Sequence, residues 1–291
     1  MGLVLAALLG CSSDGPEKKL FDAHEITNRA EEYRKTGRTE AAMRDLQRAL
    51  VLAEGTDNQL EVARLSNDVA TVYYENDDLE SALKYLRRAE AIARGRNNAE
   101  LLAVTLGNIG CVHSARGNLG LARSCYEEAL TLDEKANNRN GKARRLNNLA
   151  MLHRKQGDLE KAMNLLHEAL SINRSLKSKE GMAANLCNIA SIHEAMGNPE
   201  KAIEFYKEAL EIDKALQNLQ GVGTELSNIA HLYEGLGKTD LAIEHYRRAE
   251  NVNLLISRDD RAKQDHEAIE LVAIDNASTD GSLEILREFA S

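Results

Sequence analysis

One polar position recurs every 40 residues along most of this 291-residue chain, and five of its six members are asparagine. They are Asn28, Asp68, Asn108, Asn148, Asn188 and Asn228. An amide side chain both donates and accepts hydrogen bonds, so a row of amides can pair with the main chain of an extended peptide whatever its sequence. Such residues can also cap or bridge neighbouring helices within one fold. The predominance of asparagine favours peptide binding over that second interpretation.

Three histidines lie at the same spacing and raise the question of a metal site. They are His113, His153 and His193. Neighbouring helices lie about 8–10 Å apart, whereas a shared Zn²⁺ needs each nitrogen at about 2 Å. We therefore expect these rings to pack between helices. Cys111, Cys125 and Cys187 have neither a disulfide pattern nor zinc-ligand spacing. The sequence predicts no metal, no cofactor and no nucleophile–base pair for catalysis.

The elements that position these side chains repeat with the same step. A glycine series with one substitute comprises Gly37, Asp77, Gly117, Gly157, Gly197 and Gly237. Two alanine series comprise Ala42, Ala82, Ala122, Ala162, Ala202 and Ala242, and Ala49, Ala89, Ala129, Ala169, Ala209 and Ala249. Apolar residues recur at helical spacing on both sides of each glycine, which tolerates the positive φ of a turn. The pattern therefore predicts that each unit is a helical hairpin with small residues where its two helices meet. Stacking of such units would give a solenoid.

The repeat resembles the tetratricopeptide repeat family. A small residue recurs at Ala30, Ala70, Gly110, Ala150, Ala190 and Ala230, and a ring-bearing residue at Tyr33, Tyr73, His113, His153, His193 and Tyr233. A bulky residue of the second helix recurs at Leu46, Leu86, Tyr126, Leu166, Tyr206 and Tyr246. The resemblance implies an all-α, right-handed superhelix of about six hairpins. The expected repeats are 23–62, 63–102, 103–142, 143–182, 183–222 and 223–256.

The period of 40 exceeds the family's usual length of about 34 residues, as in the longer repeats of kinesin light chains and of Leu-Gly-Asn-type adaptors. The resemblance places the asparagine series in the concave groove. Near its centre the groove would also contain Asn147, Met151 and Lys155, with Arg144 nearby, between smaller residues of repeats three and five. A ligand carboxylate could bind Arg144 or Lys155. Equally, these cations could pair with Glu194 or other surface acids.

The N-terminus carries a separate signal over residues 1–11. Residues 3–9 are apolar, too few to span a bilayer, which needs about 20, and they have the length of a signal-peptide core. Leu8-Leu9-Gly10-Cys11 resembles the lipobox of bacterial lipoproteins, although no Lys or Arg precedes the apolar run. The resemblance implies cleavage before Cys11, lipidation of its thiol and a polar linker over 12–22. The expected location is the bacterial cell envelope, facing the periplasm; the alternative is cytoplasmic.

The C-terminal segment, 257–291, departs from the repeat. It begins with a charged stretch and continues into a β-like apolar run and a polar turn. This segment resembles a short part of the family 2 glycosyltransferases, in which Asp275 and Asp280 would contact a nucleotide. The rest of such an enzyme is missing, so we expect a cap or a fusion remnant.

The net charge of −9 and a pI near 5.5 argue against nucleic acid as a partner, because phosphate binding needs clustered cations. Taken together, the sequence predicts a non-enzymatic scaffold that binds an extended peptide or a protein partner. If the lipobox is functional, that scaffold is lipid-anchored at the membrane; if it is not, the protein is a cytoplasmic adaptor or a peptide-sensing regulator.

Overall fold

A computed structural model describes residues 15–256, and every regular element within that range is a helix. In chain order they are α2 (Pro16–Lys35), α3 (Thr39–Glu54), α4 (Gln59–Glu75), α5 (Leu79–Gly95), α6 (Ala99–Ala115), α7 (Leu119–Lys135), α8 (Arg139–Lys155), α9 (Leu159–Leu176), α10 (Lys179–Ala195), α11 (Pro199–Leu216), α12 (Leu219–Gly235) and a last helix over 239–256. The fold is all-α, as predicted.

Turns with positive φ separate these helices. Gly117 and Gly157, which follow the first helices of their hairpins, have φ of 77° and 81°, and Asp77 adopts the same conformation with φ of 60°. Four of the five turns between successive hairpins also have a residue with positive φ, at Asn97, Asn137, Lys177 and Gln217, none of them glycine; the turn between α3 and α4 has none. This second turn is not apparent from the sequence, because only the first turn carries a recurring glycine.

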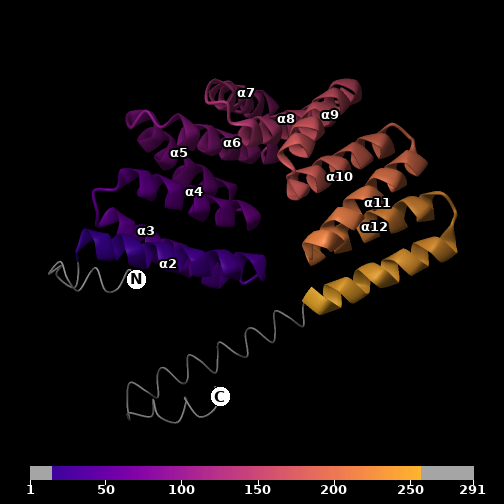
Figure 1. The fold of residues 1–291 in the computed structure, drawn as a ribbon, viewed down its shortest axis with the longest axis horizontal. Coiled ribbons are helices and arrows are strands. Elements are labelled where there is room, and N and C mark those ends of the chain that lie inside the picture. The colour runs from indigo at the N-terminus through magenta and orange to yellow at the C-terminus, as the bar shows by residue number, and fades with distance from the viewer. Residues whose placement is uncertain (1–14, 257–291) are drawn as a thin grey trace, which may run out of the picture.

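The helices pack in pairs to form an α-solenoid. Members of both alanine series, such as Ala162 and Ala169, have no exposed surface, and the apolar side chains around them join one hairpin to the next. The first helices of successive hairpins also contact one another, α4 with α6, α6 with α8 and α8 with α10. The stack bends into an open arc with α2 at one end and the helix over 239–256 at the other (Figure 1).

Two sequence predictions concern the ends of this arc. The first helix begins at Pro16, which is well suited to a first helical position. It therefore includes residues 16–22, which the sequence analysis assigned to a linker. Cys11, Asp275 and Asp280 lie outside the described residues. Over the described range, none of the helices has the length and apolar character needed to cross a membrane.

Candidate functional site

The asparagine series lies on the first helices of the hairpins. Asn108, Asn148 and Asn188 are half-buried on the mutually contacting α6, α8 and α10. Asp68 and Asn228 are half-buried on α4 and α12. Asn28, on the terminal helix α2, is exposed.

Three of these amides bridge neighbouring hairpins. Asn108 Nδ2 donates to Asn67 Oδ1 at 3.1 Å, and Asn188 Nδ2 donates to Asn147 Oδ1 at 2.8 Å. Asn148 Nδ2 lies 3.8 Å from Cys111 Sγ, a weak contact. The bridging role considered in the sequence analysis is therefore present. It uses the amide nitrogens of Asn108, Asn148 and Asn188, whose Oδ1 atoms accept no hydrogen bond from described residues.

A groove of about 520 Å³ follows α6, α8 and α10. Its lining includes four predicted residues, Asn108, Arg144, Asn147 and Asn148. It also includes residues that the sequence analysis did not propose: Val104, Asn140, Ala143, Arg145, Asn173, Ser178, Glu180, Gly181, Ala184 and Asn185. The central part of the predicted site is thus a real concavity, and it is rich in amides.

Six predicted residues lie outside this lining. They are Asn28, Asp68, Asn188, Asn228, Met151 and Lys155. Met151 is half-buried one turn along α8. Lys155 is exposed, and its Nζ donates to the main-chain oxygen and the Oγ of Ser114, both at 3.1 Å. Lys155 therefore ties α8 to α6 through Ser114. Arg144 is exposed at the groove.

Buried polar groups join the hairpins beside this groove. We call the contact between two successive hairpins a junction, numbered one to five from the N-terminus. At junction three, Asp133 on α7 and Arg145 on α8 are 2% and 4% exposed, and Arg145 Nε lies 3.3 Å from Asp133 Oδ2. Asn138 Nδ2 donates to Asp133 Oδ1 at 2.7 Å. A Cβ at Gly107 would collide with the Arg145 guanidinium, so this glycine makes room for the ion pair.

Junction four has amides at the equivalent positions. Asn173 Nδ2 donates to Asn185 Oδ1 at 2.7 Å, and Asn185 Nδ2 donates to Asn147 Oδ1 at 3.0 Å. Asn147 Oδ1 also accepts a hydrogen bond from Asn188, so this oxygen joins three side chains directly, and Asn173 is connected to it through Asn185. The amides that face the groove are therefore held in place by a network that reaches into the core.

Junction five is acidic. Asp213 on α11 and Glu225 on α12 are 4% and 3% exposed, and Cys187 on α10 completes the set. Burial, followed by the nearby Asp213 carboxylate, raises the pKa of Glu225 to about 7. Burial, followed by the charge of Glu225, raises the pKa of the Cys187 thiol to about 12.

These residues could have been found from the sequence. Positions 133, 145 and their equivalents repeat every 40 residues, and at junction one they are the apolar Ala53 and Leu65. A charge at a position that is apolar elsewhere in the repeat is a detectable signal of a specialised junction. The positions that stand out most in the sequence are those that stay polar from one repeat to the next.

The histidines pack between helices. His113 and His153 are buried, and His193 stacks on Phe205 with ring centroids 5.2 Å apart. Burial lowers the pKa of all three. Within residues 15–256, no group of three potential ligands is placed to hold a metal ion. Cys111, Cys125 and Cys187 are free thiols.

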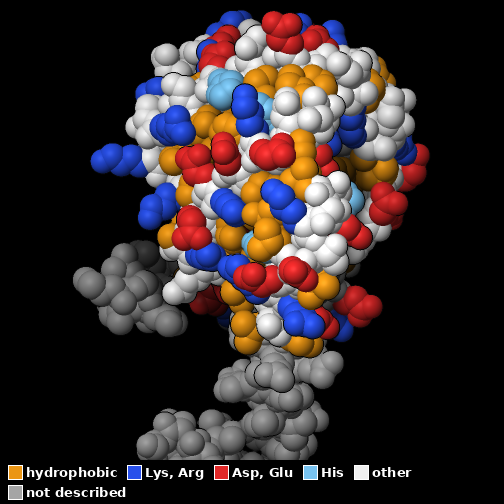
Figure 2. Space-filling view, turned by 90° about the vertical axis from the view of Figure 1, so that its right-hand side faces the viewer, with side chains coloured by type: hydrophobic (Ala, Val, Ile, Leu, Met, Phe, Trp, Pro, Cys, Tyr) orange, Lys and Arg blue, Asp and Glu red, His pale blue; other side chains and the backbone are white. Residues whose placement is uncertain are grey.

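Charge on the surface is mixed. Figure 2 shows acidic and basic side chains interspersed over one face of the solenoid. Near the N-terminal end, Asp68 faces Arg34; burial raises the pKa of Asp68 to about 6, and the Arg34 charge opposes that rise.

Comparison with known proteins agrees with this architecture. The family model described as tetratricopeptide repeat matches residues 22–95, 101–175, 142–215 and 181–254. Among curated proteins, the comparison found no match.

Solved structures share the fold at low sequence identity. The Rap conjugation gene regulator of plasmid pLS20, solved in complex with the Phr* peptide, aligns with a TM-score of 0.66 and 17% identity over 86% of this chain and 78% of its own. BtubC from P. vanneervenii aligns with a TM-score of 0.58 and 18% identity over 77% of this chain and 91% of its own. Kinesin light chain-type repeats from Podosopora anserina align with a TM-score of 0.52 and 18% identity over 67% of this chain and 97% of their own.

Proposed function

Because this chain belongs to the tetratricopeptide repeat family, we propose that it is a protein-interaction scaffold that binds an extended peptide in the groove along α6, α8 and α10. The observation that carries this proposal is the row of half-buried amides lining that groove. Their nitrogens hold neighbouring hairpins together, and the oxygens of Asn108 and Asn148 remain to accept hydrogen bonds from a peptide main chain.

Pre-organisation supports the same conclusion. Asn147 is held by Asn185 and Asn188, and Asn185 by Asn173. A peptide that binds such a fixed surface does not have to order these side chains, which reduces the entropic cost of association. The pLS20 regulator, which was solved with a peptide bound, has a similar fold and provides a precedent.

The charges of the groove indicate where an acidic ligand group would bind. Arg145 is already paired with Asp133 inside the junction, whereas Arg144 is exposed at the groove. A carboxylate of the ligand would therefore bind Arg144. Among the described residues we assign no catalytic group, so the proposed activity is binding.

The test uses peptides selected from a displayed library of random 12-residue sequences on the wild-type protein. We expect Asn108→Ala/Asn148→Ala to weaken binding of the selected peptides by about tenfold or more, because each lost hydrogen bond costs about 1 kcal/mol. The affinities would be measured by isothermal titration calorimetry.

The matched control is Asn164→Ala, an exposed asparagine on the outer helix α9, which should bind as wild type does. Circular dichroism would verify that each variant is folded. Unchanged affinity of a folded Asn108→Ala/Asn148→Ala protein would refute main-chain recognition by the asparagine series.

We also propose that Cys11 is lipidated and anchors this scaffold in the bacterial envelope, with the groove facing the periplasm. The support is the Leu8-Leu9-Gly10-Cys11 segment. Labelling with palmitate in bacterial cells should mark the wild type and not Cys11→Ala. A wild-type protein without label would favour the cytoplasmic adaptor instead.

A further inference from the structure

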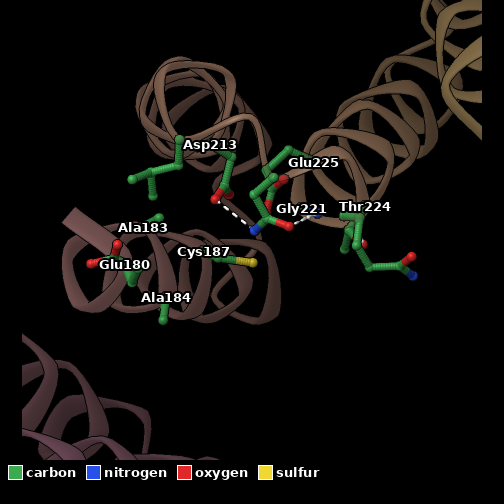
Figure 3. Close-up of a pocket in the computed structure, with 11 residues that line it drawn as sticks. Glu180, Ala183, Ala184, Cys187, Asp213, Gly221, Thr224 and Glu225 are labelled. Atoms are coloured by element: carbon green, nitrogen blue, oxygen red, sulfur yellow. Dashed lines mark hydrogen bonds between the residues drawn. The ribbon is translucent and has the colours of Figure 1, made fainter. Parts of the chain in front are cut away.

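A second cavity lies beside the groove, where α10, α11 and α12 meet at junction five. It measures about 500 Å³, and its charged lining residues, Glu180, Asp213 and Glu225, are all acidic. Glu180 and Ala184 also line the amide groove, so the two cavities are adjacent. Figure 3 shows Asp213 and Glu225 converging from α11 and α12, with Cys187 directed at the same space from α10.

The two carboxylates differ in how they are satisfied. Asp213 Oδ1 accepts a hydrogen bond from Asn218 Nδ2 at 2.9 Å. Glu225 is only 3% exposed. Its carboxylate has a side-chain hydrogen bond with Cys187, but its Oε2 has no hydrogen-bond partner among the described residues. A buried carboxylate oxygen without a donor is costly, and it is rare in folded proteins. Glu225 lines the cavity, so a donor group of a ligand could reach this oxygen.

Junction three shows which donor fits this arrangement. Asp133 corresponds to Asp213, and Asn138 holds it as Asn218 holds Asp213. The residue that completes junction three is Arg145, whose guanidinium lies on Asp133. At junction five the equivalent of Arg145 is Glu225, so the chain supplies a second acid in place of the cation.

We propose that the cavity at junction five binds a guanidinium group, carried by an arginine side chain of the bound peptide, between Asp213 and Glu225. This inference rests on the proposed peptide-binding function and specifies one side chain of its ligand. A guanidinium offers several N–H donors in one plane, enough for both carboxylates. The shared rim at Glu180 places this arginine next to the main chain held by the amide groove.

The probe is N-acetyl-arginine amide, compared with the neutral and nearly isosteric N-acetyl-citrulline amide. Titration into the full chain would be followed by NMR shifts of the amides of Gly221 and Thr224, which line the cavity. We expect saturable shifts with the arginine probe and affinity at least about tenfold weaker for citrulline, since charge-assisted hydrogen bonds are the stronger ones.

Two variants each remove one negative charge from the cavity. If one of them does not fold, the other still tests the proposal. Glu225→Gln and Asp213→Asn should each weaken binding of the arginine probe by about tenfold. The control Asn164→Ala, on α9, should bind as wild type does. Equal affinity for both probes, or wild-type affinity in folded Glu225→Gln and Asp213→Asn, would overturn the proposal.

A third variant copies junction three into junction five. Gly107 makes room for Arg145, and Cys187 occupies the equivalent position, so the variant is Cys187→Gly/Glu225→Arg. Its added guanidinium should occupy the cavity, and the arginine probe should no longer shift Gly221. Persistent wild-type binding would contradict the assignment of the site.

The two proposals fail separately. The probe carries one side chain and needs no groove, so its failure concerns only the cavity at junction five. Unchanged peptide affinity in a folded Asn108→Ala/Asn148→Ala protein would concern only the amide groove.

Discussion

Junctions three and five share the same hydrogen bonds around a buried aspartate, but the residue beside that aspartate has the opposite charge. In both, a buried aspartate accepts a hydrogen bond from the side chain of the asparagine that caps the next helix. That asparagine in turn accepts a hydrogen bond from a main-chain nitrogen, of Gly141 at junction three and of Gly221 at junction five. Junction three adds Arg145 and is closed by its own ion pair. Junction five adds Glu225 and contains a cavity.

Under the proposal for junction five, the same repeat position makes a structural contact at one junction and binds a ligand at another. Each hairpin contacts mainly its neighbours, so a substitution at one junction leaves the others intact. Arg145 in place of an acid makes a structural contact, whereas Glu225 at the equivalent position leaves a carboxylate oxygen unsatisfied. The predictions that follow test this contrast, beginning with the largest effect.

Removal of the acid at junction three should be the most damaging change. Asp133→Ala leaves the Arg145 guanidinium buried without its partner, and we expect the free energy of unfolding to fall by about 3–5 kcal/mol. Urea denaturation would measure the loss, and hydrogen exchange would locate it to α7 and α8.

The chain provides the control for that change. Asp133→Ala/Arg145→Leu reproduces the residues of junction one, Ala53 and Leu65. This double variant should recover most of the lost stability, because no unpaired charge remains. If the single variant lost less than about 1 kcal/mol, the ion pair would not be the closing contact of junction three.

The charge at junction five should make stability depend on pH. The pKa of Glu225 is about 7 in the folded chain, above its ordinary 4.5, so the folded state holds a proton that the unfolded state releases earlier. The free energy of unfolding should therefore fall as pH rises from about 5 to 8. At pH 8 it should be about 2–3 kcal/mol larger for Glu225→Gln than for the wild type.

The comparison is made as a difference between the two unfolding curves across pH. Asp68, whose pKa is also raised, to about 6, titrates in both proteins and cancels. The two proteins should have nearly the same stability at pH 5. A difference that does not vary between pH 5 and 8 would show that Glu225 does not titrate in this range.

The glycines beneath the two aspartates should respond unequally to alanine. A Cβ at Gly141 would collide with Asp133, which Arg145 and Asn138 hold in place. We expect Gly141→Ala to lower the free energy of unfolding by about 1–2 kcal/mol. Gly221→Ala should cost less, since Asp213 borders a cavity and can move aside. Thermal unfolding of both variants would rank them.

Gly120→Ala is the control for the glycine comparison. This helical glycine has no neighbouring atom within 4 Å of an added Cβ, so the variant should be as stable as wild type or slightly more stable. A larger loss for Gly221→Ala than for Gly141→Ala would mean that Asp213 is the more tightly held aspartate.

The smallest effect should come from the exposed ion pairs near junction three. Lys142 Nζ lies 3.0 Å from Glu134 and 3.1 Å from Glu168, with all three side chains partly in solvent. Lys142→Ala should cost no more than about 0.5 kcal/mol, and the cost should shrink in high salt. A loss comparable to that of Asp133→Ala would remove the distinction between buried and exposed pairs.

The repeat, its helices and the small residues at their contacts follow from the amino-acid sequence alone. The 40-residue step at Gly157 and Ala162 specifies a turn and a close helix contact whatever the neighbouring repeats contain, because φ and side-chain size are local properties. The step also placed Asn108 and Asn148 on the inner helices. For that reason the fold and the centre of the groove were predictable.

The contacts of the polar side chains, in contrast, depend on how the helices are arranged in three dimensions. That arrangement directed the nitrogens of Asn108 and Asn188 to neighbouring hairpins, placed Lys155 on Ser114, and divided the acids into one paired with Arg145 and one unsatisfied at Glu225. The physical reason is that a hydrogen bond or an ion pair depends on burial and on distances of about 3 Å between separate helices. A spacing along the chain brings such groups to the same junction without determining which of them meet.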